Sequence, residues 1–250
     1  MPFAIVVQGQ LLGEAGKINP AQLHGAFFTL LRDPQLRQEA HEMSGRKAFT
    51  LSPLTVSGTG RAWFRVSFLE DHFYANFVQY FLESRVPRVS LGAAELHVER
   101  VISSPGRWSG YASYDELLAK ARPERELTLE FRSPTAFRQG DLVTPLPLPK
   151  LVFQSYLQRW EQFSPVELLP DLIERAERGL GLARHNIQTR PFFDGHGLVP
   201  GFVGRVTFMI KGLGDELARQ LNALADYAFY AGTGWKTTHG MGLTRRLTGR

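Results

Sequence analysis

The sequence predicts an α+β protein made of two tandem ferredoxin-like (βαββαβ) domains. Apolar side chains recur at every second residue in several segments, which indicates strands, and at helical spacing in others. The order of these segments occurs twice along the 250 residues, a length that can supply two cores. A connection rich in proline and glycine separates the two runs, so we expect domains at 1–122 and 123–250.

In the first half, Asn19-Pro20 is typical of a helix start, and the segment Arg61 to Glu70 alternates most regularly. We expect, in order, a strand at 3–12, a helix from 20, a short helix from 34 to about 43, strands at 48–54 and 61–70, a helix from 71 and a strand at 96–102. Apart from the extra short helix, this is the ferredoxin-like order.

The same order follows in the second half. We expect a strand at 126–132, a proline-rich loop at 133–149, helices at 150–162 and 165–179, strands at 184–193 and 201–211, a helix from 215 and a last strand at 238–247. No repeat is visible residue by residue, so the prediction depends on element order alone.

Composition limits the function. A net charge of +5 and a pI of about 9.6 favour an anionic partner. The absence of cysteine excludes disulfides, thiolate zinc sites and cysteine nucleophiles. No apolar run reaches the ~18 residues of a membrane helix, and the first residues lack a signal-peptide pattern. We therefore expect a cytoplasmic protein with no membrane association.

A glycine-rich stretch, 230–246, follows the last predicted helix. Its glycines and polar or basic residues are Gly232, Gly234, Lys236, Thr237, Thr238, Gly240, Gly242, Arg245 and Arg246. Glycine allows close approach to the main chain, and exposed N–H groups beside a lysine and hydroxyls suit a phosphate chain. Gly232 is also placed to cap the helix. The alternative is a glycine-rich hairpin with a solvated basic edge.

His41 is the strongest candidate for chemistry, because Arg46 and Lys47 follow it after a turn. An imidazole beside fixed cations can move protons during phosphodiester cleavage, with the RNA 2′-hydroxyl as nucleophile. The alternative is a solvated histidine at a helix end. His24 is a candidate second proton-transfer group, although a structural role would also explain it.

The remaining histidines carry weaker signals. His72, His97 and His185 have no acidic or histidine partner at metal-ligand spacing, and His196 and His239 fall in a turn and in the glycine-rich stretch. We therefore predict no metal site and no cofactor. A separate basic and aromatic strand face, with Arg61, Trp63 and Arg65, could track an RNA strand or be an ordinary exposed sheet face.

Three segments resemble the CRISPR-associated repeat-specific endoribonucleases of the RAMP superfamily (Cas family six). They are His41 with the run 45–54, the run 129–140 with 145–147 and 151–160 behind it, and the terminal loop 232–242. The resemblance implies two ferredoxin-like folds, a glycine-rich loop that contacts repeat RNA, and cleavage by a histidine with a nearby lysine. On this basis His41 matches the catalytic histidine and Lys47 the catalytic lysine. The family's usual tyrosine on the first helix has no match, since Phe27 and Phe28 occupy that neighbourhood.

The leading hypothesis is a metal-independent endoribonuclease that cuts precursor CRISPR RNA within its repeats, leaving 2′,3′-cyclic phosphate and 5′-hydroxyl ends. CRISPR repeat RNA is the expected partner; other subunits of an effector complex and a homodimer are left open. The rival is a non-catalytic RAMP subunit that binds guide RNA in a ribonucleoprotein. A third interpretation is a basic ferredoxin-like protein with no role in RNA.

Overall fold

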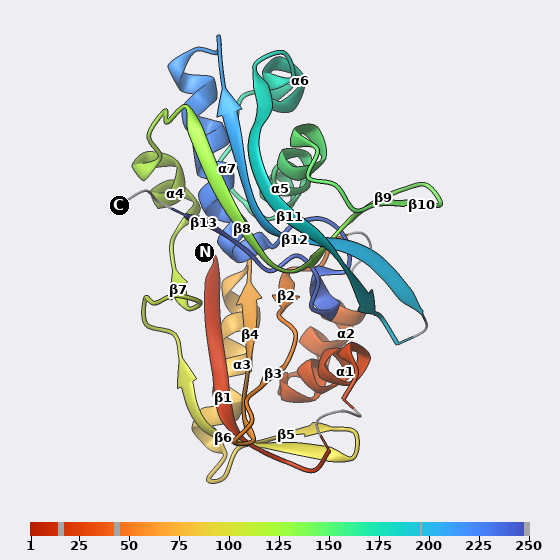
Figure 1. The fold of residues 1–250 in the computed structure, drawn as a ribbon. Coiled ribbons are helices and arrows are strands. Elements are labelled where there is room, and N and C mark those ends of the chain that lie inside the picture. Colours follow the sequence, from red (N-terminus) through yellow and green to blue (C-terminus); the bar gives the residue numbers. More distant parts are fainter. Residues whose placement is uncertain (15–17, 43–45, 196, 248–250) are drawn as a thin grey trace. The chain divides into compact units, whose positions relative to one another are not determined.

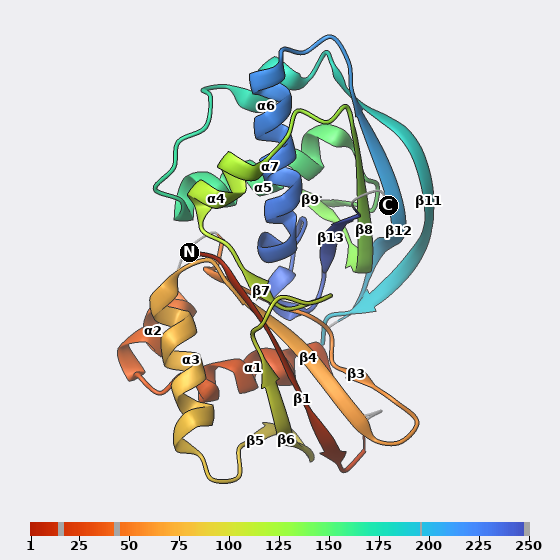
Figure 2. The ribbon, with the colours of Figure 1, turned by 90° about the vertical axis from the view of Figure 1, so that its left-hand side faces the viewer.

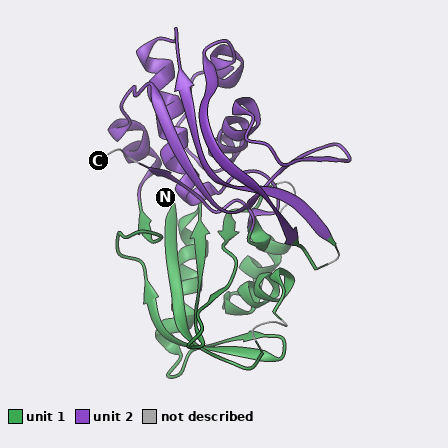
Figure 3. Cartoon of the chain, in the orientation of Figure 1, with its two compact units in different colours: residues 1–111, 193–197, 238–240 green, residues 112–192, 198–237, 241–250 purple. Residues whose placement is uncertain are grey.

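The computed structural model describes residues 1–14, 18–42, 46–195 and 197–247 (Figure 1). Contacts divide the chain into two compact units (Figure 3). Unit 1 comprises Met1–Tyr111, Phe193–Gly197 and Thr238–Gly240, and unit 2 the rest. The first segment of unit 1 ends at Tyr111, before the domain boundary that we expected after residue 122. That boundary stays a prediction.

Unit 1 is one antiparallel sheet with helices on one of its faces (Figure 2). Its strands are β1 (Phe3–Leu12), β2 (Phe49–Leu51), β3 (Thr55–Val56), β4 (Arg61–Phe68), β5 (Arg88–Leu91), β6 (Ala94–Ile102) and β7 (Gly110–Tyr111), and its helices are α1 (Pro20–Leu30), α2 (Pro34–Glu42) and α3 (Asp71–Glu83). The sheet order is β2-β4-β1-β6-β5, with β3 beside β4 and β7 beside β1. Without the short additions, β2-β4-β1-β6 is the ferredoxin-like arrangement.

The predicted alternation of β4 is confirmed on its apolar face, where Ala62, Phe64, Val66 and Phe68 are buried. The opposite face differs from the expectation. Arg65 is only 2% exposed, and its Nε donates to the Trp108 carbonyl at 2.7 Å. An arginine held in this way cannot contact an RNA strand. The prediction of an exposed face formed by Arg61, Trp63 and Arg65 is therefore wrong for Arg65.

Unit 2 repeats the arrangement with longer elements. Its strands are β8 (Glu126–Thr135), β9 (Phe137–Gln139), β10 (Leu142–Thr144), β11 (Leu180–Phe193), β12 (Leu198–Ile210) and β13 (Thr244–Leu247), and its helices are α4 (Tyr114–Lys120), α5 (Pro149–Phe163), α6 (Leu172–Ala176) and α7 (Asp215–Ala231). The main sheet has the order β11-β12-β8-β13, and its helices lie on one side of it (Figure 2). The prediction of two tandem ferredoxin-like folds is confirmed.

Two segments of unit 2 differ from the sequence prediction. The expected proline-rich loop contains the β9–β10 hairpin, which turns at Gly140 with φ 60°. The expected helix at 165–179 shortens to α6, because Pro170 interrupts it and the preceding segment is held by side chains. Trp160 Nε1 donates to the Val166 carbonyl at 2.7 Å, and the Leu169 amide donates to Gln220 Oε1 at 2.7 Å.

A 3₁₀ turn, η2 (Thr237–His239), replaces the start of the strand expected at 238–247. Thr237 belongs to unit 2, whereas residues Thr238–Gly240 belong to unit 1, and the chain returns to unit 2 at Met241. Among the described residues, the helices are too short or too polar to cross a bilayer.

Candidate active site

His41 lies in the last turn of α2, where its ring is exposed while the neighbouring Ala40 is buried. Lys47 returns to this helix end, since its Nζ donates to the His41 carbonyl at 2.8 Å. A cation suits this place because the last carbonyls of a helix carry partial negative charge. Burial lowers the pKa of Lys47. The structure therefore brings the two predicted catalytic residues together, through a backbone contact that leaves the imidazole of His41 exposed.

His24 lies on α1 and is fixed by the η2 turn. Its Nδ1 is 2.9 Å from the Thr238 carbonyl oxygen, and its ring stacks on His239 with centroids 4.0 Å apart. A carbonyl only accepts hydrogen bonds, so Nδ1 carries the proton and the neutral ring presents its lone pair at Nε2. His24 thus has a defined tautomer, which is what a proton acceptor requires.

Burial lowers the pKa of His24 below the ordinary 6.5, and the charges of Lys47 and His41 act in the same direction. The hydrogen bond to Thr238 opposes this shift. Desolvation and like charges both disfavour the imidazolium, so His24 is neutral near pH 7.

The two histidines line one hollow between α1 and α2, with a volume of about 550 Å³. Phe28 lies between them, its ring centroid 5.1 Å from that of His24 and 5.7 Å from that of His41. The other residues that line the hollow are Ala21, Gly25, Pro34, Arg37, Gln38 and Glu42. This arrangement can place a reacting group near two imidazoles and an arginine against a largely apolar wall.

The two phenylalanines of α1 have different roles. Phe27 is 1% exposed and stacks on Phe49 at 4.0 Å between centroids, so it belongs to the core. Phe28 faces the hollow but has no hydroxyl to donate. Neither phenylalanine can therefore replace the missing tyrosine. Among the described residues of α1 that line the hollow, His24 is the one that can transfer a proton.

The glycine-rich stretch is tightly packed rather than open. Gly232 ends α7 with φ 64°, as predicted, and its amide donates to the Ala228 carbonyl at 3.0 Å. At Gly242, φ is 73° and an added Cβ would overlap the Thr233 carbonyl oxygen, so glycine is required. Gly234 and Gly240 also have positive φ, at 76° and 103°.

Most amides of this loop already have acceptors within the protein. The Thr233 amide donates to Gly242 at 2.9 Å, that of Trp235 to Ala136 at 2.9 Å, and that of Gly242 to Pro134 at 3.0 Å. The expectation of a cradle of exposed N–H groups is therefore wrong for these positions. Glycine serves here to bring main-chain segments together, and sequence composition cannot separate that use from anion binding.

The basic and polar residues of the loop divide into two groups. Lys236 Nζ lies over the Trp235 ring, 4.7 Å from its centroid, and the Arg138 guanidinium lies 5.5 Å from the same centroid. Thr237 is 3% exposed, and its hydroxyl accepts a hydrogen bond from Arg159 at 2.8 Å. Lys236 is the more accessible of these two predicted contact residues.

Arg245 and Arg246 are held by carboxylates of unit 2. Arg245 Nε donates to Glu130 Oε2 at 2.7 Å. The Arg246 side chain is 8% exposed and pairs with Glu124 at 2.6 Å and with Asp226 at 3.1 Å. Their charges are therefore offset inside the fold, which the sequence did not indicate because the partners lie far away along the chain.

Two histidines that we expected to have no acidic partner are close to carboxylates. His72 Nε2 lies 3.7 Å from Glu39 Oε1, and with Glu70 the three residues could offer ligand atoms within 4.8 Å of one another. His97 Nε2 lies 2.6 Å from Glu95 Oε2. Glu39 lies on another helix than His72 and could not be found from spacing, whereas Glu70 and Glu95 each stand two residues before a histidine and were overlooked. His196 lies outside the described residues.

Two tandem ferredoxin-like folds, with a glycine-rich segment near the C-terminal end and histidines lining a hollow on the first two helices, define a protein of the RAMP type. The family model of the CRISPR-associated endoribonuclease Cas6 matches residues 129–244. This range includes the second and third segments on which the sequence resemblance was based.

Similar proteins agree with this match. A Thermus thermophilus Cas6 in a product complex has a TM-score of 0.89 and 34% identity, with 99% of each chain covered. A Cas6 in a substrate mimic complex has a TM-score of 0.82 and 32% identity, over 98% of this chain and 99% of that one. The chain belongs to the Cas6 family.

Among curated relatives, the Mycobacterium tuberculosis Cas6 endoribonuclease is 37% identical over 127 residues, which cover 50% of this chain and 40% of that protein. A Streptococcus thermophilus Cas6 endoribonuclease is 26% identical over 133 residues, 51% of this chain and 54% of that protein. The matched part thus spans about half the length of these relatives or less.

Proposed function

We propose that this protein is an endoribonuclease that cleaves precursor CRISPR RNA within its repeats, by attack of the RNA 2′-hydroxyl on the adjacent phosphate. The observation that carries the proposal is the hollow lined by both His24 and His41, with Lys47 at the end of the same helix. Similarity to Cas6 proteins solved with product and with a substrate mimic supports RNA as the ligand.

The tautomer of His24 assigns its role. Because Nδ1 is bonded to the Thr238 carbonyl, Nε2 accepts the proton of the 2′-hydroxyl. The 2′-oxygen then bonds to phosphorus while the bond from phosphorus to the 5′-oxygen breaks. His41, the exposed imidazole, donates a proton to the leaving 5′-oxygen. The products are a 2′,3′-cyclic phosphate and a 5′-hydroxyl, and all atoms are accounted for.

Lys47 supplies positive charge for the phosphate, whose negative charge grows in the transition state. The substrate supplies the nucleophile, its 2′-hydroxyl, and the two imidazoles transfer the protons. Cleavage is therefore proposed to be independent of metal ions.

For RNA contacts outside the hollow, we retain Lys236, Thr238 and the main chain at Gly240 from the glycine-rich stretch. Thr237, Arg245 and Arg246 already have partners within the fold, so their contribution would be indirect. The partner would be the CRISPR transcript in the cytoplasm, alone or with other subunits of an effector complex.

The decisive experiment incubates the purified protein with its repeat RNA in the presence of a chelator and maps the ends. Wild type should cut once per repeat, and a 2′-deoxy substitution at the cut site should abolish cutting. His41→Ala should still bind the RNA but lose cleavage by about 10²–10⁴-fold. Cleavage that needs magnesium would refute the mechanism, and binding without cleavage by wild type would favour the non-catalytic RAMP subunit.

A further inference from the structure

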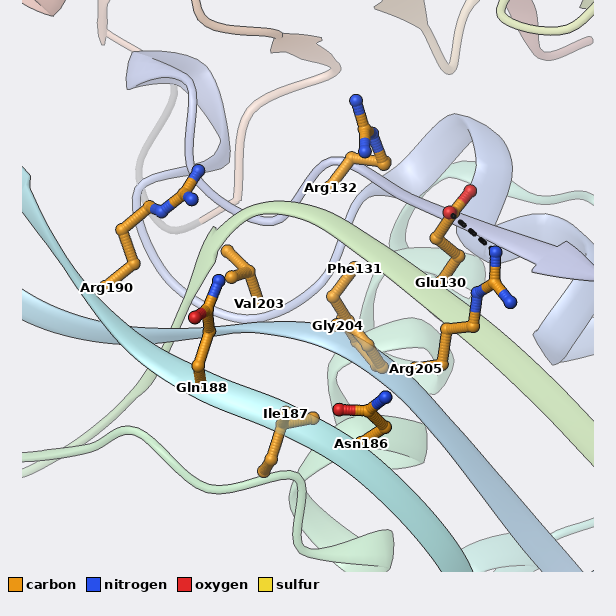
Figure 4. Close-up of a pocket in the computed structure, with 10 residues that line it drawn as sticks. All are labelled: Glu130, Phe131, Arg132, Asn186, Ile187, Gln188, Arg190, Val203, Gly204 and Arg205. Atoms are coloured by element: carbon orange, nitrogen blue, oxygen red, sulfur yellow. Dashed lines mark ion pairs between the residues drawn. The ribbon is translucent and has the colours of Figure 1, made fainter.

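A second hollow lies in unit 2, where β8, β11 and β12 run side by side (Figure 4). Its volume is about 410 Å³, within the range of roughly 300–1,000 Å³ that small-molecule sites occupy. Three of its residues, Glu130, Phe131 and Arg132, fall in the run 129–140 that resembles the family, and no other residue of the hollow was singled out from the sequence. The hollow is separate from the one lined by the two histidines, since its residues all belong to unit 2.

The main chain fixes this hollow. Gly204 has φ 129° and lies at a shift in the pairing of β12 with β8. An added Cβ at this position would overlap the Asn186 carbonyl oxygen on β11. The strands can approach one another this closely only with glycine here. Gly204 therefore fixes the close spacing of the main chains that border the hollow.

Positive charge surrounds the hollow. Arg132 from β8, Arg190 from β11 and Arg205 from β12 all line it. Among the described residues, Arg132 and Arg190 have no ion-pair partner, and Figure 4 shows both extending from the strands away from the Glu130–Arg205 pair. Guanidinium groups match the geometry of phosphate oxygens, so this excess of charge favours a phosphate-bearing ligand.

The single carboxylate of the hollow is already occupied. Glu130 Oε2 accepts from Arg245 Nε at 2.7 Å, and its Oε1 lies 3.8 Å from Arg205. Glu130 is opposite Arg205 on β12 and opposite Arg245 on β13, so the three form a row across adjacent strands. The row keeps one net positive charge, because one carboxylate faces two guanidinium groups, and Arg132 and Arg190 are left to act on a ligand.

Two side-chain amides, those of Asn186 and Gln188, also line the hollow, and an inorganic phosphate would need no such groups. Asn186 and Gln188 precede Arg190 at two-residue intervals on β11, so the three side chains share one face of the strand. An amide both donates and accepts, as the edges of nucleobases do. A guanidinium group and two amides on one strand therefore match a nucleotide better than an inorganic anion.

We propose that this hollow binds one unpaired nucleotide of the RNA substrate. Arg132 and Arg190 contact its flanking phosphates, and the Asn186 and Gln188 amides bond to the edge of its base. This inference rests on the proposed function, because it takes the precursor RNA as the ligand. It adds a subsite, separate from the hollow where cleavage is proposed to occur, that contributes to recognition of the RNA sequence.

The test measures binding by the full chain carrying His41→Ala, so that the RNA stays intact. Labelled repeat RNA is titrated against this protein, against the same protein with R132A and R190A, and against one with R184A. Arg184 is the matched control, because it lies on the same strand but outside the hollow and pairs with Glu126 at 2.6 Å. Melting temperatures of all variants report whether each is folded.

The double variant should bind about 10–100-fold more weakly, with a salt dependence reduced by about two counterions, whereas R184A should stay within about twofold. In a second series, N186A with Q188A should lower discrimination among short homopolymers more than it lowers overall affinity. Competition by inorganic phosphate at millimolar concentration, with no preference among homopolymers, would overturn the nucleotide assignment.

The outcomes separate this inference from the proposed function. Unchanged RNA affinity in a folded R132A/R190A variant would refute the subsite while cleavage by wild type still supports the nuclease. Failure of wild type and the His41→Ala chain to bind repeat RNA at all would instead refute the proposed function.

Discussion

In unit 1, the two helices that follow the first strand present imidazoles to a hollow, whereas in unit 2 the strands present guanidinium groups and amides to another. Both units have the same strand order, β2-β4-β1-β6 in one and β11-β12-β8-β13 in the other. Topology therefore does not separate them. The groups that they expose separate them, because imidazoles transfer protons near neutral pH whereas guanidinium groups stay charged and act as hydrogen-bond donors. We therefore propose that unit 1 carries the chemistry and unit 2 contributes recognition.

The largest expected effect is in unit 1. His24→Ala should slow single-turnover cleavage by about 10²–10⁴-fold, because the proposed proton acceptor is lost, while RNA affinity changes by less than about twofold. His97→Ala is the matched control, since His97 pairs with Glu95 and does not line the hollow. Rapid cleavage by folded His24→Ala would show that unit 1 acts through His41 alone.

A large effect on stability is expected in unit 2. Gly242→Ala should lower the free energy of unfolding by about 2–4 kcal/mol, through positive φ and overlap with the Thr233 carbonyl oxygen. Gly212→Ala isolates the first cause, because Gly212 has φ 71° but open space around its Cβ position. Its cost should be about 1 kcal/mol in the same denaturant titration. Equal costs at the two positions would mean that close packing of the loop contributes nothing.

Arg246→Ala tests whether this arginine belongs to the fold or to RNA recognition. Loss of its pairs with Asp226 and Glu124 should cost about 1–3 kcal/mol of stability. RNA affinity at a temperature where the variant is folded should be unchanged. A weaker complex with a smaller salt dependence would restore Arg246 to the RNA contacts that the sequence predicted.

The smallest effect concerns pH. Burial lowers the pKa of His24 below 6.5, so its basic form persists until the pH falls through that lowered value, and the acid limb of the cleavage rate should lie below pH 6.5. His239→Ala exposes the ring and should move this limb upward by less than about one pH unit. His239→Phe keeps the stacked surface and should leave the limb in place. The charges of Lys47 and His41, which also lower the pKa of His24, remain in both variants, as do Arg37 and Glu42, which line the same hollow. An identical limb in all three proteins would refute the role of His239.

The sequence predicted the order of the main elements because their signals are local. Asn19 and Gln22 form the capping box that begins α1, and the apolar face of β4 is buried as its alternation indicates. Strand β5 was not predicted, since its four residues fall in a short connection. The histidine of α2 and its lysine were found because they lie only six positions apart.

The remaining features depend on distance along the chain. His24 bonds to Thr238 across 214 residues, and Arg245 bonds to Glu130 across 115. No pattern in a single sequence indicates such pairs. The glycine-rich stretch was interpreted as an anion site because glycine composition is the same whether its partner is a phosphate or another main-chain segment.

The assignment of Thr238–Gly240 to unit 1 has a consequence for synthesis. A ribosome releases the helix that carries His24 more than 200 residues before the carbonyl that orients its ring. A nascent chain can therefore form most of unit 1 without holding that imidazole in its working tautomer. If His24 acts as proposed, a chain truncated before Thr238 would lack the acceptor that fixes the tautomer of this ring.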